Sequence, residues 1–565
     1  MLSKQKPNYP PVNWQKFTHA AKLPLAIAIP LLVSATVALP RPASAAQRIS
    51  ISYAPIERSI SIDALANYAK TGKLDNDLAA YANYAGPQSM ARLQRVLTAR
   101  IDLSPVAVSQ FFYTPQGEAL LQRLGQIIKT ESRLSGFYAL RSALILSAAD
   151  PQGLTLLNVL RYFPSNSIRV DLRLSQRMAE EIEGIISQTN KAIALVSAQS
   201  TAEINNTATQ VDFSQLPDLR KPGRYKWNKQ TLTLEDKRRN RLFPADIYIP
   251  VTSNPSPVIV ISHGLGSDRT SLAYLAQQLA SYGFAVAVPE HPGSNAEQLR
   301  SLLTGRASTA EEPSEFINRP YDVKYLLNRL QALSNTDANY QHLNLNRVGV
   351  IGQSFGGYTA LALAGAPINF AKLAKDCEDK ASTWNVSLLL QCRALQLPQT
   401  QYNLSDSRVK AAIALNPIAS SVFGQSSISK IKIPVMIVSS TNDTVAPALS
   451  EQISPFTWLT TQEKYLVMLG GGTHFSTLAD PNPKTDPVSF PTQVVGPNPA
   501  IARRYIKALS VAFFQTYVAN EQQYRPYLSA SYAQSINQAI PSVNLVQSLP
   551  SESLVQLNTT ALTPR

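Results

Sequence analysis

Residues 346–365 read NRVGVIGQSFGGYTALALAG, and this stretch decides the expected fold of the second half of the chain. Small and apolar residues, typical of a buried strand, lead into GQSFG at 352–356, and apolar residues at helical spacing follow at once. GQSFG fits the G-x-S-x-G pattern, in which a serine lies on a strained turn between a strand and a helix. The pattern alone would also fit a glycine-rich loop. With a strand before it and a helix after it, it predicts Ser354 as a catalytic nucleophile.

A reactive serine needs an acid and a base that follow it in the chain. The only histidine after Ser354 is His474, in a glycine-rich segment directly after the expected strand KYLVMLG. Asp443 follows the preceding expected strand, so its carboxylate is placed to hold the imidazole in one tautomer. Asp406 and Glu451 are alternative acids, but the first precedes a strand and the second lies on the following helix. The predicted triad is Ser354, His474 and Asp443.

An oxyanion hole requires two backbone N–H donors, one from the residue after the nucleophile and one from the loop after an early strand. The first is Phe355. The second strand and its loop read VIVISHGLGSDRTS (258–271), in which Leu265 lies between two glycines and is the expected donor. His263 in this loop and His291 at another strand end are candidate pocket residues. A structural role is the alternative, which we favour for His263, and for His291 the two roles stay open.

Short apolar runs alternate with helical segments through residues 221–519, which predicts an α/β fold with a mostly parallel sheet and helices on both faces. Inserts at 292–319 and 366–408 interrupt the alternation near the carboxyl ends of strands, where open α/β sheets bind ligands. They are candidate walls or a lid of a substrate pocket. The expected strands are 225–234, 243–250, 257–262, 284–289, 346–351, 409–415, 433–439 and 464–469.

The parts of the chain outside this domain differ in composition. A basic leader, an apolar run and an A-x-A site predict a cleaved signal peptide, and hence a secreted or periplasmic protein, with a retained anchor as the alternative. The segment after the leader has helical apolar spacing and no recognisable catalytic cluster. The expected organisation is a signal peptide at 1–45, an all-helical domain at 46–200, a linker at 201–220, the α/β domain at 221–519 and a polar C-terminal tail at 520–565.

The net charge of +15 is locally concentrated, because nine Lys and Arg residues lie between Arg220 and Arg241. This segment could make a peripheral contact with an anionic membrane or polymer surface, or it could be a solvated β-hairpin with basic turns. No nucleic-acid-binding motif accompanies it, so no nucleic-acid partner is expected. The sequence has no P-loop, dinucleotide fingerprint or metal-ligand cluster, so we expect no cofactor and no metal.

The two cysteines, Cys377 and Cys392, both lie in the second insert. In an exported protein, such a close and isolated pair is typical of a disulfide that closes a local loop. Two cysteines without neighbouring histidines are too few ligands for a structural zinc site. We therefore predict a Cys377–Cys392 disulfide.

These motifs together resemble the α/β-hydrolase superfamily over about residues 225–515. SHGLGS with GQSFGG is similar to the secreted platelet-activating-factor acetylhydrolases and to dienelactone-hydrolase-like bacterial enzymes. The resemblance implies the same nucleophile, base and oxyanion donors as above. It departs at the acid, because the position used by the animal acetylhydrolases is Asn416 here, whereas Asp443 matches the dienelactone-hydrolase-like relatives. The N-terminal part resembles an uncharacterised domain fused to such hydrolases in bacteria.

The sequence therefore predicts an exported serine hydrolase that cleaves carboxylic esters through an acyl-enzyme. Lipid-like or short-acyl esters are the candidate substrates. A lipase or polyester hydrolase acting on aggregated substrate is one alternative. A non-catalytic envelope binding protein on a hydrolase fold is another, and the complete predicted triad argues against it.

Overall fold

The computed structural model describes residues 45–53, 56–206, 211–378, 383–480, 492–538 and 540–550. These residues belong to one compact unit. The predicted signal peptide lies outside them, apart from its last residue. None of the helices in the described part is both long and apolar enough to span a membrane.

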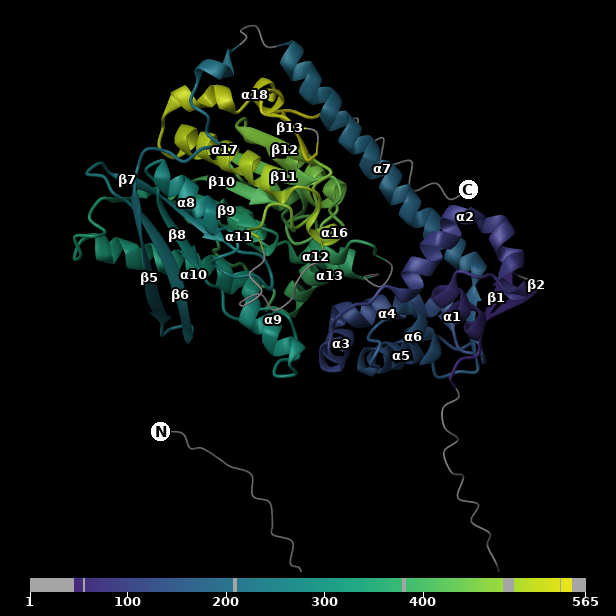
Figure 1. Cartoon of the computed structure of the whole chain (residues 1–565). Helices are drawn as coiled ribbons and strands as arrows, with labels where there is room; N and C mark the ends of the chain where they lie inside the picture. Colours follow the sequence, from purple (N-terminus) through teal and green to yellow (C-terminus); the bar gives the residue numbers. More distant parts are fainter. Residues whose placement is uncertain are drawn as a thin grey trace, which may run out of the picture. The chain divides into compact units, whose positions relative to one another are not determined.

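Nine strands of the described chain form one sheet in the order β13-β12-β11-β10-β9-β7-β8-β6-β5 (Figure 1). The central strands pair in parallel, whereas β5, β6 and β13 are antiparallel to their neighbours. The predicted mostly parallel α/β sheet and all eight predicted strands are confirmed. The bounds are β5 (Trp227–Asp236), β6 (Arg241–Pro250), β7 (Ser256–Ser262), β8 (Ala285–Pro289), β9 (Leu343–Gln353), β10 (Val409–Leu415), β11 (Val435–Ser440), β12 (Lys464–Gly470) and β13 (Ser542–Val546).

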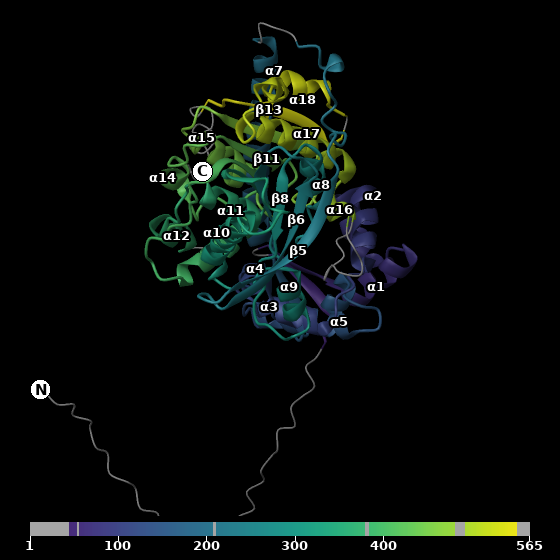
Figure 2. The same cartoon turned by 90° about the vertical axis from the view of Figure 1, so that its left-hand side faces the viewer.

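The central strands are apolar throughout because both of their faces are buried. Along β7, Ile259 and Ile261 pack into one core, whereas Val258 and Val260 pack into a second core on the opposite face. The first core includes residues of α8 (Ala273–Ser281) and α17 (Pro499–Tyr517). The second face is covered by α10 (Glu315–Ser334) and α11 (Phe355–Leu363) (Figures 1 and 2). Alternation along each strand thus builds a layer of helices on either face.

The N-terminal part is not all-helical, so that prediction is wrong. It contains a second sheet in the order β2-β1-β4-β3, in which β1 pairs in parallel with β4. Alternating Ile and Ser in RISISY and IERSIS carried a strand signal of period two. The elements are β1 (Arg48–Tyr53), β2 (Ile56–Ser61), α1 (Ile62–Thr71), α2 (Asn76–Thr98), α3 (Pro105–Phe112), α4 (Pro115–Ile127), β3 (Ile128–Lys129), α5 (Phe137–Ala149), α6 (Leu156–Arg161) and β4 (Ser167–Asp171).

A long helix, α7 (Leu172–Asn205), joins this part to the nine-stranded sheet and extends into the predicted linker. Ala192 and Val196 on α7 are fully buried against the core of the α/β domain. The rest of the predicted linker is also packed, because Leu219 is buried and its carbonyl accepts a hydrogen bond from Gln278 at 2.9 Å. The described linker residues are therefore part of the fold.

The C-terminal segment is ordered as well, which the prediction of a polar tail missed. It forms η5 (Gln522–Tyr527), α18 (Ala530–Ser535) and β13, which pairs with the edge of β12. Val543 and Leu545 on β13 are buried in the core shared with α8 and α17. A five-residue strand carries little signal of its own, and its pairing with β12 depends on residues about 80 positions away. Residues 551–565 of the predicted tail lie outside the described residues.

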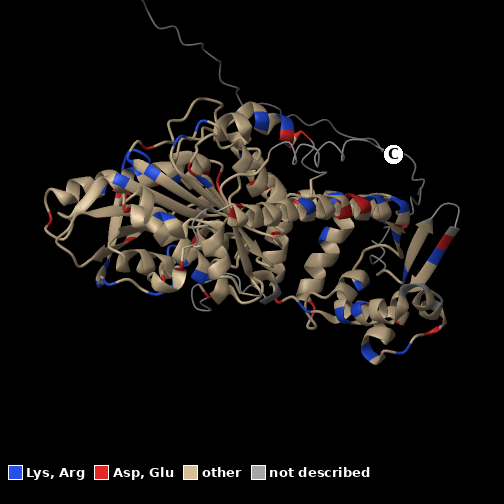
Figure 3. Cartoon of the chain, turned by 90° about the horizontal axis from the view of Figure 1, so that it is seen from above, with Lys and Arg blue, Asp and Glu red and all other residues tan. Residues whose placement is uncertain are grey.

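The basic segment between Arg220 and Arg241 contains β5 and the turn of the β5–β6 hairpin, as its alternative interpretation predicted. Figure 3 shows all described Lys and Arg residues in blue. Part of the charge of this segment is directed inward. Arg241 binds Glu315 at 2.8 Å and Asp322 at 2.7 Å, and Arg239 binds Asp322 at 2.9 Å. Both carboxylates have no exposed side-chain surface. These two arginines therefore balance buried negative charge on α10.

We expect Leu545→Ala to lower the free energy of unfolding by about 2–5 kcal/mol, because it removes a fully buried side chain from the core. Denaturant unfolding followed by circular dichroism measures the change. Leu134→Ala is the control, since Leu134 is 67% exposed and its loss should change stability by less than about 0.5 kcal/mol. Equal effects of the two substitutions would show that β13 does not contribute to the stable core.

Candidate active site

Ser354 lies on the turn between β9 and α11, with φ of 56° and ψ of −115°. The tight turn is possible because Gly352 and Gly356, two residues before and after Ser354, have no side chains. A Cβ on Gly352 would lie 2.1 Å from the carbonyl oxygen of Gly356, and a Cβ on Gly356 would lie 2.0 Å from the carbonyl oxygen of Ser262. Ser354 N–H donates to the Leu415 carbonyl at 2.8 Å, which ties the turn to β10. The strand-turn-helix context predicted for this serine is present.

The predicted base and acid lie side by side. His474 follows β12 and Asp443 follows β11, and His474 Nδ1 is 2.8 Å from Asp443 Oδ2. Asp443 Oδ1 accepts hydrogen bonds from the backbone N–H groups of Val445 and Ala446, at 2.9 and 2.7 Å. The carboxylate is thus fixed on one side and faces the imidazole on the other. Such a pair holds the imidazole with Nε2 free to accept a proton.

The serine turn and the histidine loop are directly connected. Gln353, the residue before Ser354, donates from Nε2 to the His474 carbonyl at 3.0 Å. Ser354, Asp443 and His474 are all buried, with 7, 6 and 4% of their surface exposed. This hydrogen bond therefore couples the position of the histidine loop to the serine turn within a largely water-excluded site.

Asn416, which was rejected as the acid, is a hydrogen-bond partner of Asp443. It follows β10 with φ of 43°, and its Nδ2 donates to Asp443 Oδ2 at 2.9 Å. Oδ2 therefore accepts from both Asn416 and His474. The two alternative acids are engaged elsewhere: Asp406 pairs with Arg408, and Glu451 accepts hydrogen bonds from the backbone of Ala419 and Ser420. The hydrogen bond between Asn416 and Asp443 could be identified only from the tertiary structure.

The two expected oxyanion donors lie on adjoining loops. Leu265 follows β7, and Phe355 is the first residue of α11. Within the described chain, neither backbone N–H has a hydrogen-bond acceptor. A Cβ on Gly264 would lie 2.4 Å from Gln353 Oε1, so the absence of a side chain lets the Leu265 loop approach the serine turn. The two N–H groups are free to bind a substrate oxygen.

His263 and His291 are buried and hydrogen-bonded to one another's segments. The backbone N–H of His291 donates to His263 Nε2 at 3.0 Å, so the ring proton of His263 lies on Nδ1 and donates to the Gly264 carbonyl at 2.8 Å. His291 lies between Asp322, 3.1 Å from Nδ1, and the Ser262 hydroxyl, 2.9 Å from Nε2. Burial lowers the pKa of both rings to about 3, so both are neutral near pH 7. The hydrogen bonds are those of structural histidines.

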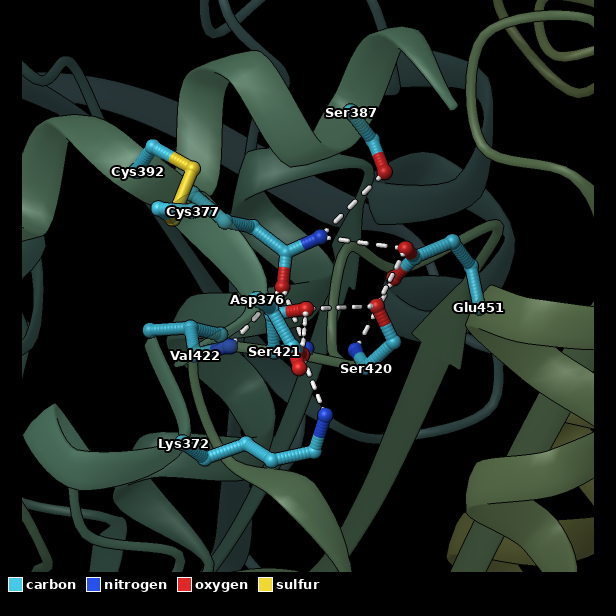
Figure 4. The surroundings of a disulfide bond; sticks show 10 residues. Lys372, Asp376, Cys377, Ser387, Cys392, Ser420, Ser421, Val422 and Glu451 are labelled. Carbon is cyan, nitrogen blue, oxygen red and sulfur yellow. Dashed lines mark hydrogen bonds and ion pairs between the residues drawn. A yellow bond between two sulfur atoms is a disulfide. The ribbon is translucent and has the colours of Figure 1, made fainter. Parts of the chain in front are cut away.

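The second insert contains α12 (Phe370–Cys377) and α13 (Val386–Gln391). The predicted Cys377–Cys392 disulfide joins the last residue of α12 to the residue directly after α13 (Figure 4). Next to it, Ser421 donates to Asp376 at 2.6 Å, and Gln391 Oε1 accepts from the backbone N–H groups of Ser421 and Val422 at 2.9 Å. The disulfide segment is thereby attached to the loop that follows β10 and carries Asn416.

A groove of about 1200 Å³ lies between this insert and α7. Its apolar lining includes Ile185 of α7, Trp384 and Leu388 of the insert, and Leu449 and Trp458. Arg123 of α4 lies over the Trp384 ring at 3.7 Å, so the N-terminal part also contacts the insert. Among the described residues, no group of three or more His, Cys, Asp and Glu side chains is arranged to hold a metal ion.

The two buried histidines make stability depend on pH. The folded chain keeps them neutral at pH values where the unfolded chain protonates them, so the unfolded state binds more protons below about pH 6.5. The free energy of unfolding should therefore fall as pH drops from about 6.5, by up to about 1.4 kcal/mol per pH unit for each ring.

Urea unfolding at pH 7, 6 and 5 measures this dependence in the wild type and in His291→Gln. In His291→Gln the free energy of unfolding should fall less steeply as pH drops, and the slope should correspond to about one proton fewer. His342→Gln changes an exposed ring and should match the wild type. An unchanged slope in His291→Gln would contradict a neutral His291 in the fold.

Comparisons with known proteins agree with this architecture. Residues 45–171 match a family described as "Alpha/beta hydrolase of unknown function (DUF1400)", and residues 248–325 match "Platelet-activating factor acetylhydrolase, isoform II". The first match covers the small N-terminal sheet and its helices. The second extends from β6 to α10 and includes β7, β8 and the Leu265 loop.

Several curated proteins are similar to the chain at low identity. Cutinase 2 of Thermobifida cellulosilytica is 24% identical over 289 residues, which are 50% of this chain and 76% of that protein. Cutinase cut1 of Thermobifida fusca is 24% identical over 289 residues, and the match covers 62% of its length. Platelet-activating factor acetylhydrolase of Canis lupus familiaris is 28% identical over 151 residues, 21% of this chain and 34% of that protein. Together with the nine-stranded sheet and the serine turn, these matches show an α/β-hydrolase fold.

Proposed function

We propose that this chain is a serine hydrolase that cleaves carboxylic esters through an acyl-enzyme. The observation that carries the proposal is the 2.8 Å contact between His474 and Asp443, because these residues follow two strands on the same side of β9, at whose end Ser354 lies. Chain order and strand positions are those required for a serine triad on this fold. The similarity to cutinases and to a platelet-activating factor acetylhydrolase supports ester hydrolysis.

The geometry supports a two-step reaction. Ser354 Oγ attacks the ester carbonyl carbon while His474 Nε2 accepts its proton, and the resulting imidazolium donates from Nδ1 to Asp443. The carbonyl oxygen becomes an oxyanion and accepts hydrogen bonds from the free N–H groups of Leu265 and Phe355. Collapse of this intermediate breaks the bond to the alkoxy oxygen, which leaves as an alcohol with the proton from His474. Water, deprotonated by His474, then hydrolyses the acyl-enzyme and releases the acid.

The surroundings of Asp443 support its assignment as the acid. Two backbone N–H groups bind Oδ1, and Asn416 binds Oδ2 beside the imidazole. These three donors restrict the rotation of the carboxylate. Asp443 can therefore hold the Nδ1–H tautomer of His474 through the whole cycle, while Asn416 orients the acid rather than replacing it.

The substrate class we propose is lipid-like or short-acyl esters. The acetylhydrolase relative supports it. The cutinase relatives favour an aggregated or polymeric ester as the second candidate. We also propose export of the chain, which the disulfide supports because such bonds persist in oxidising compartments, and peripheral membrane contact through 220–241, where several basic residues are exposed.

Labelling with a fluorophosphonate, followed by peptide mass mapping, tests the nucleophile. We expect one phosphonylated residue, Ser354, and hydrolysis of p-nitrophenyl esters that follows the labelled fraction. Ser354→Ala should abolish labelling and turnover, while Ser510→Ala, which changes a buried serine on α17, should retain both. The proposal fails if the wild type is not labelled or if Ser354→Ala is labelled to the same extent. Hydrolysis rates of esters of increasing acyl length, measured below and above the concentration at which the substrate aggregates, distinguish lipid-like or short-acyl esters from aggregated or polymeric esters as the substrate class.

Substitutions of Asp443 and of its hydrogen-bond donor Asn416 test which of the two acts as the acid. We expect Asp443→Ala to lower kcat by about 10⁴-fold, since the imidazole then loses the partner that fixes its tautomer. Asn416→Ala removes one hydrogen bond worth about 1 kcal/mol and should lower kcat by roughly 5- to 10-fold. Steady-state kinetics on p-nitrophenyl butyrate give both values. A larger loss in Asn416→Ala than in Asp443→Ala would reverse the assignment.

A further inference from the structure

Arg319, the last residue of the first insert, is a buried cation for which the proposed reaction has no direct use. It lies on α10 and has no exposed surface. Burial lowers its pKa to about 10, so the guanidinium is still charged near neutral pH. Burying a charge costs free energy of desolvation, so Arg319 is expected to have a specific role. The groups that it contacts indicate this role.

The hydrogen bonds of Arg319 go to the loop after β7. Nη1 donates to the His263 carbonyl at 2.6 Å, and Nη2 approaches the Gly264 carbonyl at 3.4 Å. The Gly264 carbonyl also accepts the Nδ1 proton of His263 at 2.8 Å. This carbonyl belongs to the same planar peptide group as the Leu265 N–H, and the two point in opposite directions. Holding the carbonyl toward Arg319 therefore aims the Leu265 N–H away from it.

Arg319 also contacts the residue that supplies the second N–H. Its guanidinium carbon lies 4.4 Å from the centre of the Phe355 ring. The other neighbours of that ring are Phe316, at 4.7 Å between ring centres, and Tyr358, at 5.6 Å. The cation and the two aromatic side chains confine Phe355 and, with it, the start of α11. One side chain thus touches both segments that carry the free N–H groups.

Ser294 holds Arg319 in this position. Its hydroxyl accepts from Arg319 Nε at 2.9 Å and is 2.8 Å from Glu315, and its carbonyl accepts from the Gly266 N–H at 2.9 Å. The first insert is thereby connected to the Leu265 loop on both sides of Leu265. The Leu265 N–H between them has no hydrogen-bond acceptor among the described residues.

We propose that Arg319 is a positioning residue for the oxyanion hole: it fixes the Gly264–Leu265 peptide and the Phe355 segment relative to each other and polarises the peptide toward a stronger N–H donor. The inference rests on the proposed serine hydrolase function. Charge neutralisation alone does not explain Arg319, because Arg241 makes the direct ion pairs to Glu315 and Asp322. The donors of Arg319 instead bind two carbonyls of the Leu265 loop and the Ser294 hydroxyl.

The test compares Arg319→Met and Arg319→Lys with Arg241→Met. The control variant removes a cation from the same buried network but does not touch the Leu265 loop. Each protein hydrolyses a p-nitrophenyl oxoester and the matching thionoester, with rates expressed per active site titrated by fluorophosphonate. Sulfur is a weaker hydrogen-bond acceptor than oxygen, so the thionoester depends less on the oxyanion hole. The ratio of the two kcat values reports the hole and is independent of the folded fraction.

We expect Arg319→Met to lower the oxoester kcat by about 10- to 100-fold and the oxoester-to-thionoester ratio by at least about tenfold, because displaced donors lose transition-state binding. KM should change by less than about threefold. Arg319→Lys should be intermediate, since lysine keeps the charge but not the fork of donors. Arg241→Met should keep the wild-type ratio.

Ser294→Ala is a milder variant that tests the role of Arg319 even if the Arg319 variants do not fold. It removes the hydroxyl that holds Arg319 Nε, and it should lower the ratio in the same direction by about 3- to 10-fold. An unchanged ratio in Ser294→Ala, or equal ratios in Arg319→Met and Arg241→Met, overturns the inference. These outcomes differ from failure of the proposed function, in which the wild type itself is neither labelled at Ser354 nor active.

Discussion

The close approach between the serine turn and the end of β7 is the constraint on which the site depends. Gly356 lies so near the Ser262 carbonyl that a Cβ there would be only 2.0 Å away. This contact is possible because β7 and β9 are paired neighbours, with Ser262 opposite Gly352 in the register. The two loops that leave these strands then lie side by side, and the N–H groups of Leu265 and Phe355 have no hydrogen-bond acceptor among the described residues. A side chain at either glycine would separate them.

Around this contact, polar groups from distant parts of the chain are held by hydrogen bonds rather than by solvent. His474 and Asp443 come from the loops after β12 and β11, and Asn416 comes from the loop after β10. On the other side, α10 contributes buried charges that the arginines of the β5–β6 hairpin balance. Because buried polar groups are costly when unpaired, each of these loops has few alternative positions. The basic hairpin and the candidate active site are therefore parts of one electrostatic arrangement.

Much of this could be predicted from sequence because the signals are local. GQSFG, its flanking strand and helix, and the single downstream histidine identify Ser354 and His474, and continuous apolar runs identify the buried strands. The small N-terminal sheet was missed because its strands are short and the partners β1 and β4 are about 120 residues apart. The strand β13 was missed for a similar reason. The whole strand has five residues, and it pairs along the open edge of β12.

The sequence by itself determined the fold class of the α/β domain, its eight strands from β5 to β12 and the residue types available for chemistry, because these follow from periodicity and from spacing along the chain. Only the tertiary structure decided which polar groups meet. It placed the Asn416 amide on the same oxygen of Asp443 that faces His474, and it gave His263 and His291 internal hydrogen bonds. It also directed Arg319 to the carbonyls of the Leu265 loop. Such pairings depend on strand order and on burial, and neither leaves a mark at any single position of the sequence.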